Sequence, residues 1–181
     1  MSQHSFEVAP SGRSKCRGCG LAIAKGEVRF GERLPNPFGD GDMVHWHHPK
    51  CACLRRPEPF LQACGGATVT QLEVGQHDIN KLKLLAEQQQ QHRRLCRLGT
   101  AQQASSGRAR CRHCKELIAK DHWRLPLIFF EEGTYASAGF IHVQCASDYC
   151  EGADVWPVIE HFAGLLTTAE RSALKVLVSA D

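Results

Sequence analysis

Aromatic side chains and long hydrophobic runs are scarce in this sequence of 181 residues. Phenylalanine, tryptophan and tyrosine make up only 7% of it, so an apolar core large enough to hold one domain is not expected without further cross-links. No run of about 18 apolar residues is present, which disfavours a membrane-spanning helix. The N-terminal segment has no apolar signal core, which disfavours secretion. We therefore expect an intracellular protein with reduced thiols.

Sequence motifs of the common catalytic classes are also missing. There is no Gly-rich phosphate-binding loop followed by lysine, no Gly-x-Ser-x-Gly elbow, no His-Glu-x-x-His motif and no deaminase signature. We therefore predict that the chain is not an enzyme. The 22 basic and 19 acidic side chains give a formal charge of +3, which is too small to indicate nucleic-acid binding unless basic groups gather on one face.

Cysteine and histidine, by contrast, are abundant, with ten of each, and many of them belong to an internal repeat. Residues 11–19 reappear as residues 106–114, and the match continues from residues 23–25 to residues 118–120. A repeat of this length indicates two homologous modules. Each module contains a Cys-x-x-Cys pair, then 28 residues in the first module or 27 in the second, and then a His-x-x-Cys pair.

The repeated cysteines and histidines have the spacing of zinc ligands. Three thiolates and one imidazole form a tetrahedral set that selects zinc over hard cations and leaves no position open for a reacting water. We therefore predict two structural Zn²⁺ ions. The ligands are Cys16, Cys19, His48 and Cys51 in the first module and Cys111, Cys114, His142 and Cys145 in the second.

Two other interpretations of these residues stay open at the level of sequence. Among the histidines of residues 45–48, His48 has the spacing that the second module repeats, but His47 is an alternative ligand. The disulfide framework of a small secreted protein is an alternative to metal binding. Four cysteines lie outside both ligand sets, and we expect them to be buried thiols rather than a third metal site. They are Cys53, Cys64, Cys96 and Cys150.

Hydrophobic alternation and turn residues predict an α+β fold in which each small, zinc-stabilised module holds an antiparallel hairpin. In the first module, strands at residues 27–34 and 43–46 flank a Pro- and Gly-rich turn, and a short helix begins near Cys51. In the second module, strands at residues 123–130 and 139–142 flank a short turn. Each hairpin is expected to return the chain to its zinc ligands.

Helical segments are predicted after each hairpin. Asp78 is expected to cap a helix that runs to about Leu98, and residues 167–170 form a capping box before another helix. Loop-forming residues place a linker at residues 98–107. The predicted organisation therefore has four parts: a zinc finger at 1–56, a helical segment and linker at 57–102, a second zinc finger at 103–150, and C-terminal helices at 151–181.

Both modules resemble the zinc finger of poly(ADP-ribose) polymerases, which also occurs in a DNA ligase and in some DNA 3′-phosphoesterases. The resemblance rests on the Ser-Gly-Arg-x-x-Cys-x-x-Cys entry, the Ile-x-Lys step, an arginine at the start of the next strand, and His-Trp-x-His-x-x-Cys in the first module. It covers roughly residues 6–56 and 103–150. It implies non-enzymatic binding of DNA strand breaks, nicks or duplex ends, with DNA-repair proteins as further partners. The location it implies is the nucleus of a eukaryote or the cytoplasm and nucleoid of a bacterium.

The resemblance also implies which side chains grip the phosphates of DNA. They are Arg13, Lys25 and Arg29 in the first module and Arg108, Lys120 and Arg124 in the second. Guanidinium groups suit phosphate oxygens, and a few such contacts give an affinity that depends on salt but not on base sequence. The alternative is that these groups are ordinary solvated surface charges.

An apolar loop in the first module is expected to stack on the base pair that a break exposes. Phe38, Met43 and Val44 are the candidates, with packing into the protein core as their alternative role. Trp46 is expected to be a core residue beside the zinc. In the second module, Tyr135 is the remaining stacking candidate.

The second module departs from the pattern of the family. Phe140 and Ile141 replace the His-Trp pair, and Glu131 and Glu132 lie in the loop where a phosphate would approach. Phe129 and Phe130 are expected to be buried strand residues. We therefore expect the first module to make the tighter contact with DNA.

Two other functions are open to this sequence. The first is a protein-interaction adaptor in which zinc holds a scaffold and the acidic segment 151–181 docks a partner. Its docking residues would be Val155, Trp156, Val158, Ile159 and Phe162. The second is an enzyme that uses a spare thiol such as Cys64 or Cys96, although no third group that would orient it can be named.

Overall fold

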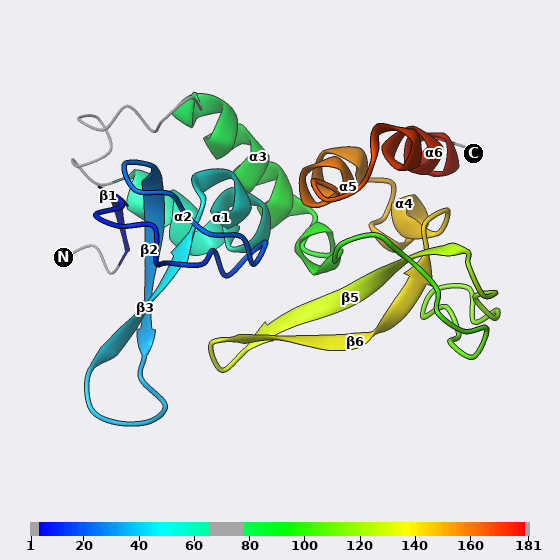
Figure 1. Ribbon diagram of the computed structural model, residues 1–181, viewed down its shortest axis with the longest axis horizontal. Helices are drawn as coiled ribbons and strands as arrows, with labels where there is room; N and C mark the ends of the chain where they lie inside the picture. Colours follow the sequence, from blue (N-terminus) through cyan, green and yellow to red (C-terminus); the bar gives the residue numbers. More distant parts are fainter. Residues whose placement is uncertain (1–3, 66–77, 180–181) are drawn as a thin grey trace. The chain divides into compact units, whose positions relative to one another are not determined.

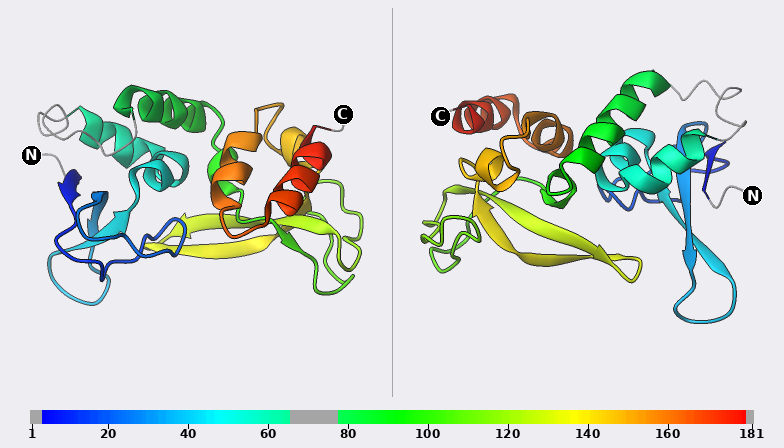
Figure 2. Two further views of the ribbon diagram at one scale, coloured as in Figure 1. Left: turned by 45° about the horizontal axis from the view of Figure 1, so that its top comes forward. Right: turned by 180° about the vertical axis from the view of Figure 1, so that it is seen from behind.

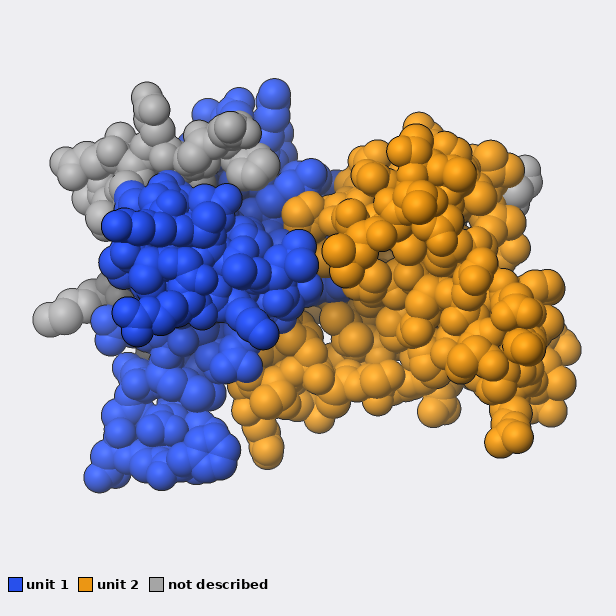
Figure 3. Space-filling model, viewed as in Figure 1, with its two compact units in different colours: residues 1–91 blue, residues 92–181 orange. Residues whose placement is uncertain are grey.

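The computed structural model describes residues 4–65 and 78–179, and the chain forms two compact units, residues 1–91 and 92–181 (Figures 1 and 3). Each unit holds a three-stranded antiparallel sheet followed by helices, in agreement with the predicted α+β class. The division between the units falls inside the predicted segment 57–102, because residues 92–102 belong to unit 2.

Unit 1 is built on a sheet with the strand order β1-β2-β3. Its strands are β1 (Ser5–Val8), β2 (Val28–Pro35) and β3 (Asp42–His47), and its helices are α1 (Pro49–Arg55), α2 (Pro57–Cys64) and α3 (Ile79–Gln91). The β2-β3 hairpin was predicted, and its tip extends away from the helices of the unit (Figure 2). An aromatic cluster forms the core, with the ring centroid of Phe30 5.4 Å from that of Phe6 and 5.9 Å from that of Phe60. This cluster packs the sheet against α2.

A buried ion pair also joins the sheet of unit 1 to its helices. Arg56, between α1 and α2, donates from Nε to both carboxylate oxygens of Glu32 at 2.9 Å, and Glu32 is only 1% exposed. A buried carboxylate needs such a partner, because its charge is otherwise costly to desolvate. Burial lowers the pKa of His4 and His45, while the charge of Glu32 acts in the opposite direction on both. Both histidines are therefore neutral inside the folded unit at neutral pH.

In unit 1, the observed starts of the helices agree with the predicted starts more closely than the observed end of α3 agrees with its predicted end. α1 starts at Pro49, slightly before the predicted start, because proline fits the first turn of a helix. α3 starts as predicted, with the Asp78 carboxylate accepting a hydrogen bond from a backbone N–H of the first turn at 2.9 Å. The helix ends at Gln91 rather than near Leu98. Leu95 and Leu98 are instead fully buried in unit 2.

Unit 2 has a second sheet with the strand order β4-β5-β6. Its strands are β4 (Gln102–Gln103), β5 (Trp123–Glu131) and β6 (Thr134–His142), and its helices are the short 3-10 helix η2 (Leu95–Arg97) and the α-helices α4 (Ala146–Tyr149), α5 (Trp156–Phe162) and α6 (Thr168–Val178). The β5-β6 hairpin was predicted, but β6 is longer than expected. The register of the hairpin shifts between Pro126 and Ile128.

The predicted linker at 98–107 is wrong, because these residues are part of the second fold. Gln102 and Gln103 pair with β5, and Gly99 N donates to the carbonyl of Pro126 at 2.7 Å. Ala101 is 3% exposed. Within this segment, Gln102 and Gln103 thus form an edge strand that corresponds to β1 of unit 1.

The C-terminal helices complete the core of unit 2. The predicted capping box is present, with Thr167 and Glu170 bonded reciprocally at the start of α6. The docking residues of the adaptor hypothesis are mostly buried in this core: Val155, Val158, Ile159 and Phe162 are each at most 6% exposed, and only Trp156 is half-buried. These four buried side chains are therefore unavailable to a partner. Among the helices of the described residues, none has the length and apolar character needed to cross a membrane.

Candidate metal centres and nucleic-acid interface

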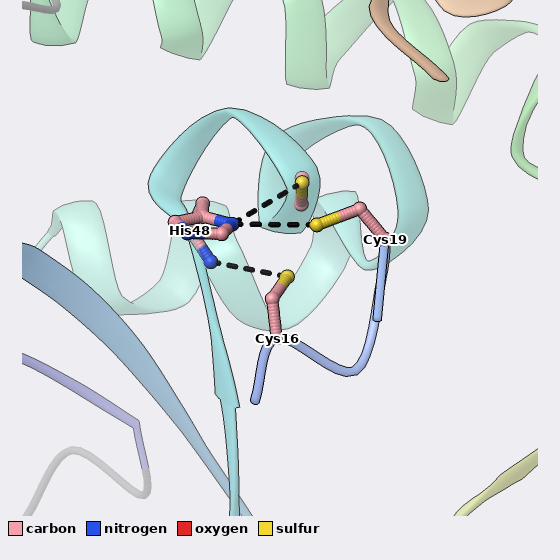
Figure 4. Close-up of side chains that lie close together, drawn as sticks. Cys16, Cys19 and His48 are labelled. Atoms are coloured by element: carbon pink, nitrogen blue, oxygen red, sulfur yellow. Dashed lines mark hydrogen bonds between the residues drawn. The ribbon is translucent and has the colours of Figure 1, made fainter. Parts of the chain in front are cut away.

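The predicted zinc ligands of unit 1 come from three separate pieces of chain (Figure 4). Cys16 and Cys19 lie on a turn closed by a hydrogen bond from Gly20 N to the carbonyl of Cys16 at 2.8 Å, His48 follows β3, and Cys51 lies in α1. The four donor atoms lie within 4.8 Å of one another. His48 N donates to Cys16 Sγ at 3.3 Å, and Cys19 Sγ lies 3.5 Å from His48 Nδ1.

This cluster attracts positive charge. Hydrogen bonds with the thiolates of Cys16 and Cys19 raise the pKa of His48 to about 10. Contacts with Cys16 first, and then with the other thiols, lower the pKa of Cys19 and raise that of Cys51. A divalent cation can supply this positive charge, because it replaces the protons held between the thiols and His48. It then binds the thiolates and a neutral imidazole together. The donor set therefore fits Zn²⁺.

Unit 2 repeats the cluster with Cys111, Cys114, His142 and Cys145, whose donor atoms also lie within 4.8 Å of one another. Cys114 Sγ lies 3.4 Å from His142 Nδ1, and His142 N donates to Cys111 Sγ at 3.4 Å. Burial opposes ionisation of Cys111, but backbone N–H donors outweigh it and lower the pKa of this thiol to about 7. Cys114 is exposed, whereas every ligand of unit 1 is buried or half-buried. The chain thus has two Cys3His sites that fit two Zn²⁺ ions.

The second ring nitrogen of each ligand histidine meets a different oxygen. His48 Nε2 lies 3.9 Å from the carboxylate of Glu27, which also accepts a hydrogen bond from Ala24 N at 2.8 Å. In unit 2, His142 Nε2 lies 3.2 Å from the carbonyl oxygen of Leu117. The Leu117 carbonyl is at hydrogen-bond distance and can orient its imidazole, whereas the Glu27 carboxylate makes a longer electrostatic contact. Unit 1 therefore has a carboxylate where unit 2 has a backbone carbonyl.

The alternative interpretations of the ligand residues are wrong. All ten cysteines are free thiols, which excludes a disulfide framework. His47 is fully buried against Phe30, with 6.1 Å between the ring centroids, and lies outside the ligand cluster. Within residues 4–65 and 78–179, no third group of metal-ligating side chains comes together.

The four remaining cysteines differ in burial. Cys53, Cys64 and Cys150 are buried as expected, whereas Cys96 is half-buried. Burial raises the pKa of Cys64 to about 11 and that of Cys150 to about 12. A thiol that stays protonated at neutral pH is a poor nucleophile, so these two do not support a thiol enzyme.

A surface cavity of about 570 Å³ lies beside the zinc ligands of unit 1. Cationic side chains on the zinc-binding loop line it together with two side chains of β3. The lining residues are Arg13, Ser14, Lys15, Cys16, Arg17, Gly20, Val44 and Trp46. Arg13, Lys15 and Arg17 are exposed and make no ion pair with any described residue. We call this basic cavity the groove.

Lys15 and Arg17 are not among the predicted DNA contacts. The signal was present, because these two cations flank the first zinc cysteine, as Arg110 and Arg112 do in the repeat. Lys25, which was predicted, is exposed and lies with its backbone next to Gly12, but it does not line the groove.

Arg29, also predicted to grip phosphate, is only 6% exposed. It donates from Nε and Nη2 to Glu7 at 3.1 and 2.5 Å, and from Nη1 to Ser14 Oγ at 2.7 Å. Its guanidinium carbon lies 3.6 Å from the ring centroid of Trp46. Trp46 is half-buried and stacks on Arg29 at the edge of the groove, rather than packing in the core as expected.

The β2-β3 hairpin carries an exposed apolar tip. Phe38 is 94% exposed, so the core-packing alternative is wrong for this residue. The Asn36 side chain accepts a hydrogen bond from Phe38 N at 3.0 Å, and Asn36 N donates to the carbonyl of Gly41 at 3.1 Å, which closes the loop. Met43 lies half-buried at the base of the tip, and Val44 lines the groove. The hairpin that carries the tip therefore also contributes Val44 and Trp46 to the wall of the groove.

The basic residues of unit 2 are arranged differently. Arg108 and Lys120 are exposed, as predicted phosphate contacts should be. Arg110 Nη1 donates to the carbonyl of Lys115 at 3.3 Å, and Arg112 Nε donates to the carbonyl of Ala138 at 3.1 Å. The counterparts of the groove cations are thus engaged with the protein's own backbone.

The predicted stacking surface of unit 2 is not an exposed tip. Tyr135 is half-buried in β6 and contacts Phe130 edge-on, with 5.0 Å between ring centroids. Phe129 and Phe130 are half-buried rather than buried, and the guanidinium of Arg97 lies over Phe129 at 4.6 Å. A tight turn at Glu132 and the following glycine, both with positive φ, ends the hairpin. This tip presents carboxylates rather than an apolar side chain.

Comparison with known proteins identifies the family of the first finger. Residues 7–94 match the family described as "Poly(ADP-ribose) polymerase and DNA-Ligase Zn-finger region". Poly [ADP-ribose] polymerase 1 of Gallus gallus is 44% identical over 45 residues, which make up 25% of this chain and 4% of that protein. The protein of the same name from Oryza sativa subsp. japonica is 24% identical over 156 residues, which make up 86% of this chain and 16% of that protein.

The chain therefore spans only a small part of these relatives, and the matches identify a zinc finger but no catalytic domain in it. The matched residues contain all four ligands of the unit 1 metal centre, and unit 2 repeats them. This chain thus carries a zinc finger of the poly(ADP-ribose) polymerase and DNA ligase family at residues 7–94, followed by a second Cys3His finger in unit 2.

Proposed function

We propose that this protein binds DNA strand breaks, nicks or duplex ends in a zinc-dependent and non-catalytic way, chiefly through unit 1. The observation that carries the proposal is the presence, in one zinc-held unit, of a basic groove lined by the zinc-binding loop and by β3, and of an apolar hairpin tip that is 94% exposed at Phe38. The family match of residues 7–94 supports the same conclusion.

The groove suits the backbone of DNA. Arg13, Lys15 and Arg17 place three positive charges beside a cavity in which described carboxylates do not compete for them. Arginine binds phosphate oxygens through two parallel hydrogen bonds, and lysine binds them as a point charge. Contacts of this kind fix position and supply affinity without reading base sequence. Lys25, on the neighbouring loop, is a fourth proposed contact.

The tip suits an interrupted duplex. An exposed phenylalanine in a loop of polar residues gains free energy when it stacks on a base, by roughly 1–3 kcal/mol. Intact duplex hides the faces of its base pairs, whereas an end or a nick exposes one. Phe38, supported by Met43 and Val44, is therefore proposed to distinguish a break from continuous duplex.

Unit 2 is proposed to have the weaker contact with DNA. Its exposed Arg108 and Lys120 offer charge, whereas the other two proposed contacts are less accessible, because Arg124 is 8% exposed and Tyr135 is half-buried. Its acidic tip and the engagement of Arg110 with backbone oxygen argue against a second site of the same strength. Because the proposed ligand is genomic DNA, the nucleus of a eukaryote or the nucleoid of a bacterium is the proposed place of action, with DNA-repair proteins as further partners.

A competition titration tests this function. The zinc-loaded protein is bound to a fluorescent nicked duplex, and unlabelled nicked, blunt-ended and closed circular duplexes compete for it. We expect nicked and blunt-ended DNA to compete strongly and closed circles weakly, with all binding lost after zinc is removed. Equal competition by closed circles would leave general DNA binding but refute recognition of breaks. Binding that persists without zinc would refute the role of the fingers.

A further inference from the structure

The inference concerns Asn36, a polar residue in the segment that joins β2 to β3 and carries Phe38. Asn36 is half-buried, whereas Pro35 and Pro37 on either side of it are exposed. Proline has no backbone N–H, so neither of these neighbours can donate a hydrogen bond that would hold the loop. The order of the tip therefore depends on Asn36 and on the residues that follow Pro37.

Three hydrogen bonds of the tip have Asn36 as a partner. Its backbone N donates to the carbonyl of Gly41 at 3.1 Å, and its carbonyl accepts from Gly39 N at 3.5 Å. Its side-chain Oδ1 accepts from Phe38 N at 3.0 Å. The first bond closes the loop directly beyond the last residue pair of the two strands. The other two bonds fold the loop back onto Asn36.

These contacts determine the direction in which the Phe38 side chain leaves the backbone. The ring of Pro37 holds its own φ at about −65°, and the bond to Asn36 Oδ1 fixes the N–H of Phe38. Gly41 has a φ of +90°, which glycine adopts without strain and which turns the chain back toward β3. Because Phe38 is 94% exposed, packing against the protein contributes little to its position.

The tip of the hairpin in unit 2 is closed in another way. Glu132 and Gly133 both have positive φ, and Thr134 Oγ1 donates to the carbonyl of Glu131 at 3.3 Å. No apolar side chain belongs to this turn of residues 131–134. The side-chain acceptor that orients the next residues is thus found on the hairpin tip that has an apolar ring to orient.

We propose that Asn36 is a positioning residue for break recognition, which holds Phe38 ready to stack on the base pair that a break exposes. A ring on a freely moving loop would lose conformational entropy on binding, whereas a loop that is ordered beforehand has already lost it. Asn36 acts through Phe38 and needs no contact of its own with DNA. This inference rests on the proposed function, and it adds a residue that carries neither a positive charge nor a ring.

A double-mutant cycle tests the coupling between Asn36 and Phe38. Asn36→Ala should weaken binding to blunt-ended duplex about fivefold, the effect of one hydrogen bond, and leave binding to closed circles unchanged. In a Phe38→Ala background the same change should have no further effect, because no ring is left to position. Asn80→Ala, at an exposed position of α3, is the matched control and should bind both DNAs like the original protein.

The readout is the ratio of the affinities for blunt-ended and closed circular duplex, with zinc content checked by native mass spectrometry. General damage to the fold would lower both affinities and leave this ratio as it was. An unchanged ratio for Asn36→Ala would overturn the proposal. An equal loss of blunt-end binding with and without the ring of Phe38 would also overturn it.

A serine at this position provides the rescue. A serine hydroxyl accepts a hydrogen bond from the backbone N–H two residues on, as asparagine does, and it adds no charge. Asn36→Ser should therefore recover most of the blunt-end affinity that Asn36→Ala loses. A serine variant that binds blunt ends no better than the alanine variant would contradict a role for the side-chain acceptor.

A further arm needs no DNA and separates failure of this inference from failure of the proposed function. Chymotrypsin cuts after phenylalanine, and a bond in an ordered loop is cut only when the loop opens. In the zinc-loaded chain, mass spectrometry of the fragment that ends at Phe38 gives the cutting rate. We expect this rate to be about fivefold higher for Asn36→Ala than for the original protein or Asn80→Ala.

The outcomes of these experiments are distinct. Equal cutting rates would overturn the positioning role of Asn36 even if the DNA titrations support recognition of breaks. If Phe38→Ala instead binds blunt ends as tightly as the original protein, the proposed role of Phe38 fails, and the cutting rates still show whether Asn36 holds the tip.

Discussion

The salt dependence of DNA binding offers the sharpest test of the groove. Each phosphate that a cation neutralises releases condensed counterions and contributes about −0.9 to the slope of log affinity against log salt. Arg13, Lys15, Arg17 and Lys25 are the proposed contacts of unit 1, whereas Arg29 is internally neutralised. These contacts together give a contribution of about −3.6, so a rise from 50 to 200 mM salt should weaken binding by unit 1 about 150-fold.

The variant to compare carries Arg13→Gln and Arg17→Gln in the complete chain. Two contacts fewer should make the slope shallower by about 1.8, whatever unit 2 contributes, because the same unit 2 is present in both proteins. Lys81→Gln, on α3 and outside the lining of the groove, is the control for a change of charge alone. It should leave the slope as it is in the original protein.

Fluorescence anisotropy of a labelled nicked duplex, titrated at five or more salt concentrations, measures these slopes. Zinc content and circular dichroism are recorded for each protein, so that a lost fold is not taken for a lost contact. A double variant whose slope equals that of the Lys81→Gln control would refute the assignment of Arg13 and Arg17 to phosphate. A slope that becomes shallower by the same amount in the Lys81→Gln control would instead mean that overall charge, rather than the groove, determines binding.

Three further predictions concern the tip, the metal and the core. Phe38→Ala should lose about 1–3 kcal/mol of binding to nicked or blunt-ended DNA but almost none to closed circles, and an equal loss for closed circles in competition titrations would refute a role of Phe38 in recognising breaks. A chelator should remove zinc from unit 2 before unit 1, because Cys114 is exposed, and native mass spectrometry combined with thiol alkylation would reveal the opposite order. Stability of unit 1 should fall as the pH drops below about 6.5, since burial lowers the pKa of His4 in the folded state and the unfolded chain then binds a proton that the folded chain does not. Urea unfolding gives the free energy of unfolding at pH 7.0 and at pH 5.5, and the difference between these two values should be smaller for His4→Gln than for the original protein. His4 faces Glu32 and Arg56. An unchanged difference would exclude His4 as the cause of the pH dependence.

The features that the sequence predicts well are those with local or repeated signals. The ligand sets follow from spacing and duplication, and the two hairpins follow from alternation around turn residues. The capping box at Thr167 is a contact over three residues. Exposure of Phe38 follows from its position in a loop of proline, glycine and aspartate, although sequence alone left packing open.

The features that it misses depend on partners distant in the chain. Glu7 and Arg29 are 22 residues apart, and Glu32 and Arg56 are 24 apart, so no local pattern marks either pair. β4 looks like a linker because its glutamines satisfy no hydrophobic pattern, and only pairing with β5 makes it a strand. Arg29 matched the motif of a phosphate contact, and the structure encloses it because Glu7 meets it across the sheet.

The ligands of the unit 1 metal centre come from three pieces of chain, and this determines how the protein would respond to scarce zinc. One ion ties together the turn of Cys16, the end of β3 and α1, so its departure frees all three pieces at once. A shortage would then divide the molecules into intact and inactive populations instead of loosening every molecule slightly. Titrations on a partly depleted sample should accordingly show fewer sites, each with undiminished strength.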